Sequence, residues 1–369
     1  MLNYAVDRNA QTSASRAISV SKPEARNSAG FAGFPPEYFA LVMATGIVSL
    51  AVHDQGWEYA AQVLFWLNFA AYFVLWVLTL LRFFRYRTQL MDDLTHHFHS
   101  AAFLTIVAGT CILGCQFAIL TPWMSVAKLL WLAGIGLWVM LNYTFFTVVT
   151  VRDPKPSLEA GINGVWLLTV VATESISVLG TLVAPSFSRT KLAHFVSLAA
   201  GLTGAMFYLF FITLILYRWM FFRMRPEKLT PDYWIDMGAL AIATLAGALL
   251  LSAADRWSLL RDLTPFLAGF TLLFWTTATW WIPLLLIVEI WRHAKGHVKW
   301  TYSPDYWSMV FPLGMYSMAT DVLAKVLNLP SLNPIAATFA WIAACAWAIT
   351  FFGLIRNLAH QLHRPMAGT

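Results

Sequence analysis

One acidic residue stands in the middle of a long apolar stretch of this sequence. Glu174 lies in the segment VVATESISVLGTL, and no Lys or Arg lies at a comparable depth. A charge at the centre of a membrane-spanning helix costs at least about 2.5–3.5 kcal/mol, so such residues usually serve a function. Apolar surroundings favour the protonated acid, which can donate a hydrogen bond to an anion that the ionised form would repel. We expect a proton or substrate site at Glu174, and the alternative is a protonated packing residue.

A second candidate is the Phe-Pro pair in SPDYWSMVFPLG, which begins at Ser303. Inside a helix, Pro312 removes a backbone hydrogen bond and clashes with the carbonyl group of Ser308, so we expect a kink there. The ring of Phe311 would project from this kink. A large apolar ring at the narrowest point of a pore blocks it by excluding water. The alternative is an ordinary packed phenylalanine, one of 27 in the chain.

Glycine and hydroxyl side chains recur in the same set of apolar segments. Glycine allows helices to approach closely or leaves room for a lumen, and hydroxyl groups can replace part of the hydration shell of an anion. We expect these residues to line a pore, and close helix packing is the alternative for each of them. They are Thr45, Gly46, Thr105, Gly109, Thr110, Thr173, Ser177 and Gly238.

The remaining ionisable residues suggest no cofactor. His96, His97 and His99 form one cluster, but a metal site needs ligands that converge from several places, so an interfacial or pH-sensing patch is expected. A membrane metalloenzyme that uses this cluster is the remote alternative. Asp236 and Asp321 lie near helix ends, where we expect them to reach the interface. The three cysteines lie inside apolar segments and predict neither a disulfide framework nor a zinc site.

The elements that must hold these residues are long and apolar. The 369-residue chain is 59% hydrophobic and 11% charged, whereas soluble domains carry about 25% charged residues. Ten apolar segments are long enough for helices that cross a bilayer core of about 30 Å, and they do not alternate as strands do. They run near 36–52, 60–81, 97–120, 124–150, 162–184, 192–217, 231–253, 263–290, 304–324 and 334–358. This pattern predicts an all-α integral membrane protein with ten transmembrane helices.

Lys and Arg are distributed unevenly between the alternate loops of this arrangement. Of the 24, 18 fall on the side that holds both termini. The positive-inside rule therefore places both termini in the cytoplasm, in a multi-pass protein of the inner (plasma) membrane. Residues 1–33 are polar and lack the apolar core of a signal peptide, so we expect a flexible cytoplasmic tail, followed by the transmembrane domain at 34–362 and a short tail at 363–369. No basic run interleaved with aromatics indicates a nucleic-acid partner.

A repeated motif relates the segments to one another. PDYW occurs at Pro231 and again 73 residues later at Pro304, and PEYF at Pro36 has the same chemistry. The motif fits a helix start, with Thr230 or Ser303 as the cap, proline at the first position and an acid in the first turn. Its Tyr and Trp would lie at headgroup depth. Because the spacing is close to multiples of one hairpin, we expect five helical hairpins whose odd-numbered helices form one equivalent set.

Two further motifs resemble one known family. MATGIVSL in the first segment resembles the Met-x-Thr-Gly-Ile signature of the tellurite-resistance/dicarboxylate transporter family. WSMVFPLG resembles the Trp-x-x-x-Phe-Pro-x-Gly of the same family in the ninth segment. This family includes TehA-type channels, plant slow anion channels, malate permeases and fungal sulfite pumps. The resemblance covers nearly the whole chain after residue 33.

The resemblance implies an architecture and a function. Five hairpins would stand with quasi-fivefold symmetry around a central pore, and homotrimers would contain one pore in each protomer. The gating phenylalanine of the family corresponds to Phe311, beside Pro312. The implied substrates are small anions, first C4-dicarboxylates such as malate, with efflux of sulfite, tellurite or another inorganic anion as the alternative. Glu174, as an acidic residue in the middle of this pore, departs from a plain anion channel and favours a proton-linked or neutral-acid mechanism. A purely structural scaffold is another alternative, but it would not need the repeated pore-like helices.

Overall fold

The computed structural model describes residues 36–97, 99–296 and 301–362, which belong to one compact unit. Among these residues the structure contains helices and no β-strand, as the sequence predicts. The two expected tails, 1–33 and 363–369, lie outside the described residues.

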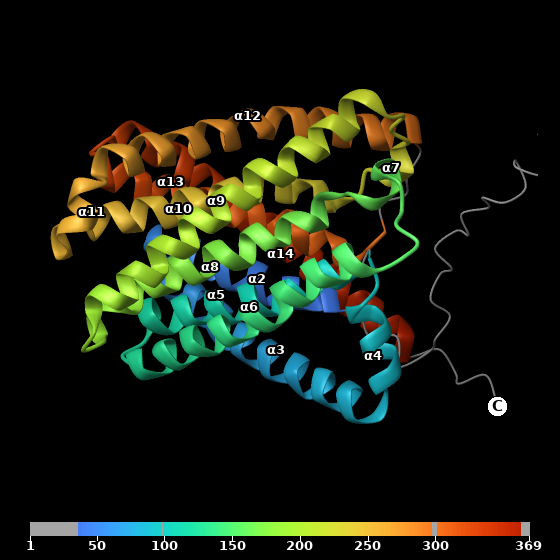
Figure 1. Cartoon of the computed structure of the whole chain (residues 1–369), viewed down its shortest axis with the longest axis horizontal. Helices are drawn as coiled ribbons and strands as arrows, with labels where there is room; N and C mark the ends of the chain where they lie inside the picture. The colour runs from blue at the N-terminus through green and yellow to red at the C-terminus, as the bar shows by residue number, and fades with distance from the viewer. Residues whose placement is uncertain (1–35, 98, 297–300, 363–369) are drawn as a thin grey trace, which may run out of the picture. The chain divides into compact units, whose positions relative to one another are not determined.

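Ten of the described helices are long (Figure 1). They are α2 (Phe39–Asp54), α3 (Glu58–Arg85), α5 (Leu104–Leu120), α6 (Met124–Val151), α8 (Leu168–Val183), α9 (Thr190–Phe221), α10 (Ile235–Ser252), α12 (Thr264–Gly296), α13 (Trp307–Val326) and α14 (Asn333–Leu362). The short helices α4 (Arg87–Leu94), α7 (Leu158–Gly161) and α11 (Ser258–Asp262) lie in the connections between them.

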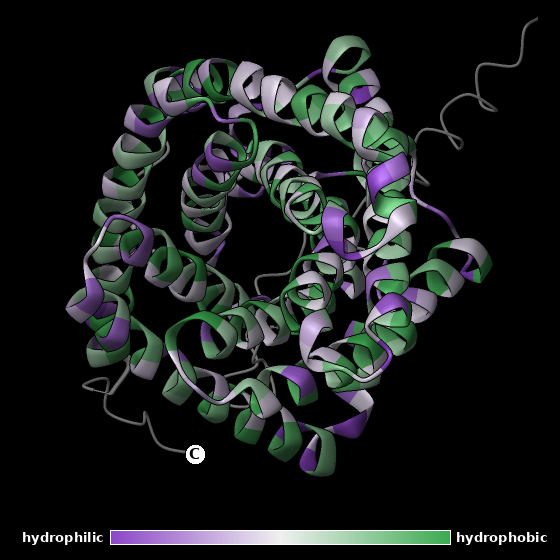
Figure 2. Ribbon diagram, turned by 90° about the vertical axis from the view of Figure 1, so that its left-hand side faces the viewer, coloured by the Kyte–Doolittle hydropathy of each residue, from purple (hydrophilic) through white to green (hydrophobic). Residues whose placement is uncertain are grey.

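The long helices form two layers. In the inner layer, α2 packs against α5, α5 against α8, α8 against α10, α10 against α13, and α13 against α2, so the contacts close a ring. Each ring helix also packs against the long helix that follows it, which is α3, α6, α9, α12 or α14. Figure 2 looks along the helices and shows this second set outside the first. We call the two sets the ring helices and the outer helices.

Burial separates the two layers. The apolar windows of α5, α8 and α10, with their first turns, are 83–94% buried, whereas those of the five outer helices are 22–39% buried. The exposed side chains of the outer helices are largely apolar, for example Phe73, Phe210 and Ile349. A helix that is apolar on all sides belongs in a protein interior, and one with an exposed apolar face fits a lipid environment. The ring is therefore shielded by helices suited to lipid.

Eight helices in the described part of the chain are long and apolar enough to cross a membrane. They include all five outer helices and three ring helices. The ring helix α2 is apolar but has only 16 residues, and α13 is not among the eight. The class of an all-helical membrane protein is thus confirmed, whereas the count of ten spans stays a prediction.

The repeated motif forms short 3-10 turns at the starts of ring helices. These are η2 (Pro36–Tyr38), η7 (Pro231–Trp234) and η9 (Pro304–Tyr306), and the turns η3 (Ser100–Phe103) and η4 (Gly164–Leu167) start the other two ring helices. Neighbouring turns pack against each other in the order η2, η3, η4, η7, η9 and back to η2. All five ring helices therefore begin at the same end, which we call the motif end.

The structure confirms the expected helix start in part. Thr230 and Ser303 occupy the cap positions, and a proline follows each of them. Their hydroxyl groups do not cap the backbone. Instead, Thr230 donates to Asp232 at 3.1 Å and Ser303 donates to Asp305 at 3.0 Å, because a 3-10 turn brings the carboxylate two residues ahead back towards the hydroxyl.

Three aromatic residues of the motif are buried inside the protein. Tyr233, Trp234 and Trp307 are at most 5% exposed, so they face other protein groups, and their place at headgroup depth stays a prediction. The hydroxyl group of Tyr233 accepts a hydrogen bond from Arg218, and the indole of Trp307 donates to the hydroxyl group of Tyr302 at 3.2 Å. Their polar edges are satisfied by other protein groups, since the motif turns pack against one another and against the outer helices.

Candidate functional site

Four contacts fix the orientation of α13 in the ring. Pro312 faces α10 and Gly314 faces α2, which are its two ring neighbours. Thr320 accepts a hydrogen bond from an indole of α12, and Ser317 donates to a carbonyl group of α14. Around α13, the helices α10, α12, α14 and α2 thus occupy every side but one.

Phe311 lies on the remaining side of α13, between α2 and α10. Successive residues of an α-helix are rotated by about 100°, so Phe311 is turned about 100° from Pro312, away from α12 and α14 and between α10 and α2. This side faces the interior of the ring. Met315 and Met318 follow four and seven residues later and share it. All three side chains are buried, and Phe311 is 1% exposed. The two methionines were missed by sequence reasoning, although their helical spacing from Phe311 could have indicated them.

Pro312 brings α13 into close contact with the neighbouring ring helix α10. The structure describes α13 as one helix that continues through this proline. The proline ring packs on Gly238 of α10, where a Cβ atom would lie 2.6 Å from Cγ of Pro312. Gly238 therefore allows α10 and α13 to approach closely, which was the alternative to a pore-lining role.

Gly46 and Gly109 also stand where ring helices approach each other. A Cβ atom on Gly46 would lie 2.6 Å from a methyl group of Ile112 in α5, and one on Gly109 would lie 3.3 Å from Val42 in α2. Both glycines are needed for close packing between α2 and α5. The structure thus favours the packing alternative for these positions.

Hydroxyl groups of four ring helices face outwards to aromatic side chains. In each pair the aromatic residue belongs to the outer helix that precedes the ring helix around the ring. The pairs are Thr45 with Trp347 (2.9 Å), Thr110 with Tyr72 (2.9 Å), Thr173 with Trp138 (2.8 Å) and Thr320 with Trp275 (3.0 Å). The expectation that Thr45, Thr110 and Thr173 line a pore is therefore corrected, because their polar atoms join the two layers. Thr105 donates to the carbonyl group of Ala102 in η3, the turn that starts its own ring helix, at 2.6 Å.

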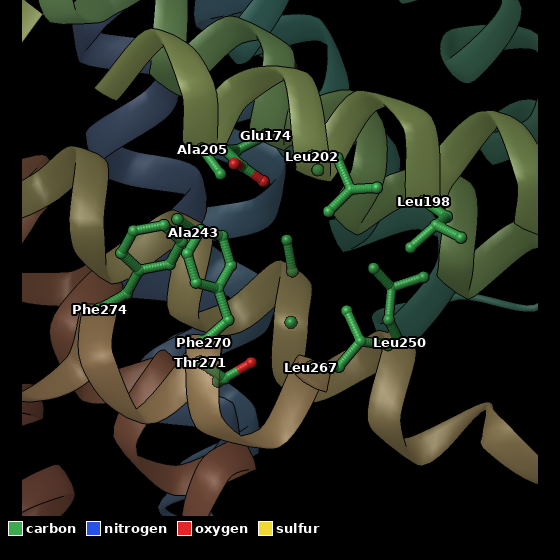
Figure 3. Close-up of a pocket in the computed structure, with 13 residues that line it drawn as sticks. Glu174, Leu198, Leu202, Ala205, Ala243, Leu250, Leu267, Phe270, Thr271 and Phe274 are labelled. Atoms are coloured by element: carbon green, nitrogen blue, oxygen red, sulfur yellow. The ribbon is translucent and has the colours of Figure 1, made fainter. Parts of the chain in front are cut away.

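Glu174 and Ser177 lie between ring and outer helices as well. A Cβ atom on Gly204 of α9 would lie 2.5 Å from Oε1 of Glu174, and one on Gly201 would lie 3.1 Å from Oγ of Ser177. Figure 3 shows the carboxyl group of Glu174 pointing into a small cavity bordered by side chains of α9, α10 and α12. Two of these helices are outer helices, so this cavity is not the ring interior that Phe311 faces. The structure separates the two residues that the sequence analysis had placed in one pore.

Comparisons with known proteins identify the family of this fold. Residues 33–355 match the family described as "Voltage-dependent anion channel" (SLAC1), which covers most of the chain. The chain belongs to this family. It is the family of TehA-like and slow-anion-channel-like proteins that the two sequence motifs indicated, and the expected resemblance is confirmed.

Similar proteins in other organisms agree with this assignment. An uncharacterized membrane protein of Mycobacterium tuberculosis is 36% identical over 152 residues, which is 41% of this chain and 77% of the relative. An uncharacterized transporter of Methanocaldococcus jannaschii is 23% identical over 334 residues, covering 88% and 95% of the two chains. The sulfite efflux pump SSU1 of Trichophyton rubrum is 25% identical over 348 residues, covering 86% and 89%. The chain is thus a membrane protein of an anion-transporting family.

The histidine cluster does not resemble a metal centre in this family member. The ring of His97 lies 5.4 Å from that of Trp166, whereas Nδ1 of His99 lies 3.7 Å from a carboxylate oxygen of Glu37. The two side chains thus have different neighbours. Across the described ranges, no group of three or more His, Cys, Asp and Glu residues is placed to hold a metal ion.

The two aspartates that were expected at the interface differ from each other. Asp236 is fully buried on α10, so that expectation is wrong for it. The reason is that η4 packs directly on the backbone of η7 through Gly164 and covers the first turn of α10. Asp321 is 7% exposed and forms an ion pair with Lys325 at 2.5 Å, and the lysine side chain is 64% exposed. Asp321 thus reaches solvent through its partner.

The motif end brings the three repeated acids near one another. Glu37, Asp232 and Asp305 lie on the turns η2, η7 and η9, and η9 packs against both of the others. Electrostatic interaction links Asp232 to both Asp305 and Glu37. The spacing that first suggested a repeat therefore produces an acidic rim at one end of the ring.

Proposed function

We propose that this protein moves small anions through the interior of the five-helix ring, with Phe311 as the gate. The observation that carries this proposal is the orientation of α13, which turns Phe311 to the one side that no neighbouring helix occupies. Met315 and Met318 share that side. An anion in contact only with aromatic and thioether groups loses hydration without compensation, so this closed state blocks conduction by excluding water and ions.

The proposed topology has ten spans arranged as five hairpins with quasi-fivefold symmetry. The closed ring of contacts supports it, because each ring helix and its following outer helix make the same kind of pair. In this arrangement α2 and α13 are the two spans beyond the eight helices of sufficient length and apolarity. The motif end and both termini lie in the cytoplasm, and the protein is in the plasma membrane, as the distribution of Lys and Arg favours. The family resemblance further implies a homotrimer with one pore in each protomer.

Two substrate classes remain for this pore. Sulfite or another inorganic oxyanion is favoured by full-length similarity to proteins named sulfite efflux pump. A C4-dicarboxylate such as malate is the second candidate, since the motif MATGIVSL in the first span resembles the branch of the family that contains both malate permeases and sulfite pumps. Both are small oxygen-rich anions, so one apolar gate would serve either.

The proposal is tested by flux into proteoliposomes that contain the purified protein. Initial rates for sulfite, malate, tellurite and chloride are measured at a fixed membrane potential, with protein-free liposomes as the control. We expect flux of at least one oxyanion well above the control, with sulfite faster than malate if the sulfite assignment is right. An intact, folded oligomer that passes none of these anions contradicts the proposed function.

A further inference from the structure

A small cavity lies beside Glu174, outside the ring interior. Its volume is about 20 Å³, which is room for one water molecule. Most of the other side chains around it are apolar, and Figure 3 shows Leu202, Ala243 and Phe270 near the carboxyl group. The cavity therefore offers Glu174 a place for a single hydrogen-bonding partner in otherwise apolar surroundings.

The carboxyl group of Glu174 has no partner of its own. The side chain is 1% exposed, and in the described structure neither oxygen makes a hydrogen bond to protein. Gly201 and Gly204 of α9 leave the space that it occupies, since a Cβ atom on Gly204 would lie 2.5 Å from Oε1. A buried polar group without a partner costs free energy, and the cost is far larger when the group is charged. The site is thus built to hold a carboxyl group in its neutral form.

A second buried acid lies on the side of α10 that borders this cavity. Asp236 precedes Ala243, which borders the cavity, by seven residues, so it lies two turns or about 10 Å away along one face of the helix. Neither of its carboxylate oxygens has a hydrogen-bond partner among the described residues. Asp236 also acts electrostatically on Tyr208, which follows Gly204 by about one turn of α9. The two acids therefore line one seam between α8, α9 and α10.

We propose that Glu174 and this cavity form a proton-binding site that lies outside the anion path, with Asp236 as the next proton acceptor towards the motif end. The bound proton is the O–H hydrogen of the neutral Glu174 carboxyl group. On release, the O–H bond breaks, the proton passes to a water molecule in the cavity, and a carboxylate remains. Because that carboxylate would be buried against α9, release requires the seam to open or to take up more water. Proton binding and the packing of α9 against α8 are thereby coupled.

Few other titratable groups face this site. Tyr208 lies on α9 beyond Gly204, Asp236 lies on α10, and the bordering residues of α12 are apolar apart from the hydroxyl group of Thr271. His194 lies on α9 at the far side of Leu198, where Arg256 acts on it electrostatically. The acidic rim at the motif end is a separate source of pH dependence, so the test must distinguish it from Glu174.

Infrared spectroscopy tests proton binding without reference to transport. The neutral carboxyl group of Glu174 should give a carbonyl stretching band at neutral pH in the purified full-length protein, and this band should be lost in Glu174→Gln. The band should remain in Glu227→Gln, which changes an exposed glutamate of the short turn before η7. Asp236→Asn should remove a different band. If wild type and Glu174→Gln give the same carboxyl bands at neutral pH, Glu174 is ionised there and the proposal is overturned.

A pair of glycine variants tests the cavity itself. Gly204→Ala places a methyl group where the carboxyl oxygen lies, so it should shift or abolish the Glu174 band. Gly269→Ala, on α12, is the matched control, because a Cβ atom there meets nothing within 4 Å. An unchanged band in folded Gly204→Ala would show that the carboxyl group does not occupy this cavity.

The transport consequence rests on the proposed function and is measured separately. Glu174→Gln should transport anions with a flatter pH dependence than wild type, whereas Glu37→Gln at the acidic rim should leave the Glu174 band in place. Absence of anion flux in wild type would defeat the proposed function and leave the infrared result standing. Flux curves that rise and fall together in wild type and Glu174→Gln would show that this proton site does not act on transport.

Discussion

The side of α13 that carries Phe311 and the cavity beside Glu174 are both buried and largely apolar, but they differ in chemistry. The side of α13 that faces the interior carries an aromatic ring and two thioethers. The cavity outside the ring contains a carboxyl group with no protein partner. An anion path benefits from a barrier that carries no negative charge, because a carboxylate there would repel the substrate. In the proposed arrangement the acid lies outside that path and is buried between helices.

This difference separates two properties that one mid-pore residue would have combined. Phe311 should determine how fast anions pass, and Glu174 should determine how the protein responds to protons. Each property can then be changed without the other, and the following predictions test that separation.

The largest effect is expected at Phe311, the proposed gate. Phe311→Ala removes the aromatic ring of the proposed gate and should raise the initial anion flux by about tenfold or more, which corresponds to about 1.4 kcal/mol in barrier height. Phe311→Leu should raise it less, since leucine keeps an apolar blockade. The pH dependence should remain that of wild type in proteoliposomes at fixed potential. A folded, oligomeric Ala variant with unchanged flux would make Phe311 a packing residue.

Thiol labelling tests which side of each helix faces the path. The variants are made with Cys345→Ser, because Cys345 is the exposed cysteine and Cys111 and Cys115 are buried. Met315→Cys should react several-fold faster with a small anionic thiol reagent when Phe311→Ala is added. Ser177→Cys, which faces α9, should stay slow in both backgrounds. Equal acceleration at both positions would refute the assignment of the ring interior.

The smallest effect is expected for a hydroxyl group that joins the layers. Thr173→Val removes the acceptor for the indole of Trp138 and should lower stability by about 1 kcal/mol, because the indole N–H loses its partner. Flux and its pH dependence should not change. Thr213→Val on the exposed face of α9 is the control, and thermal unfolding in detergent is the measurement. Altered gating in Thr173→Val would place this hydroxyl group nearer the path than the structure does.

The fold class could be predicted from simple features of the sequence. Long apolar segments, few charges and the repeated motif indicate a helical membrane protein, and the order of ring and outer helices follows from the hairpin repeat. The Phe-Pro pair identifies Phe311 because proline has a strong and local effect on a helix. These signals depend on residue type and position alone.

The rotation of each ring helix about its own axis, which decides the side that faces the ring interior, could not be predicted in the same way. Ring helices are apolar on every side, so their sequences contain no amphipathic pattern that marks an interior face. Thr45, Thr173 and Ser177 looked like pore residues because a hydroxyl group is unusual in such a segment. Their partners are aromatic residues or glycines of other helices, whose positions only the packing reveals. Asp236 was misplaced for a related reason, since its burial depends on two 3-10 turns that pack over it.

The hydrogen bond between Thr45 and Trp347 joins residues 302 positions apart. The ring helix α2 therefore packs against helices that are synthesised much later, α13 and α14. Until the hairpin of α13 and α14 is inserted, α2 lacks these neighbours on one side, and the hydroxyl group of Thr45 lacks its hydrogen-bond donor, Trp347. Contacts of such long range are slow to form, so the packing of α2, one of the two long helices with only 16 residues, is completed late. A chain truncated before α13 should therefore also have a less stable hairpin of α2 and α3.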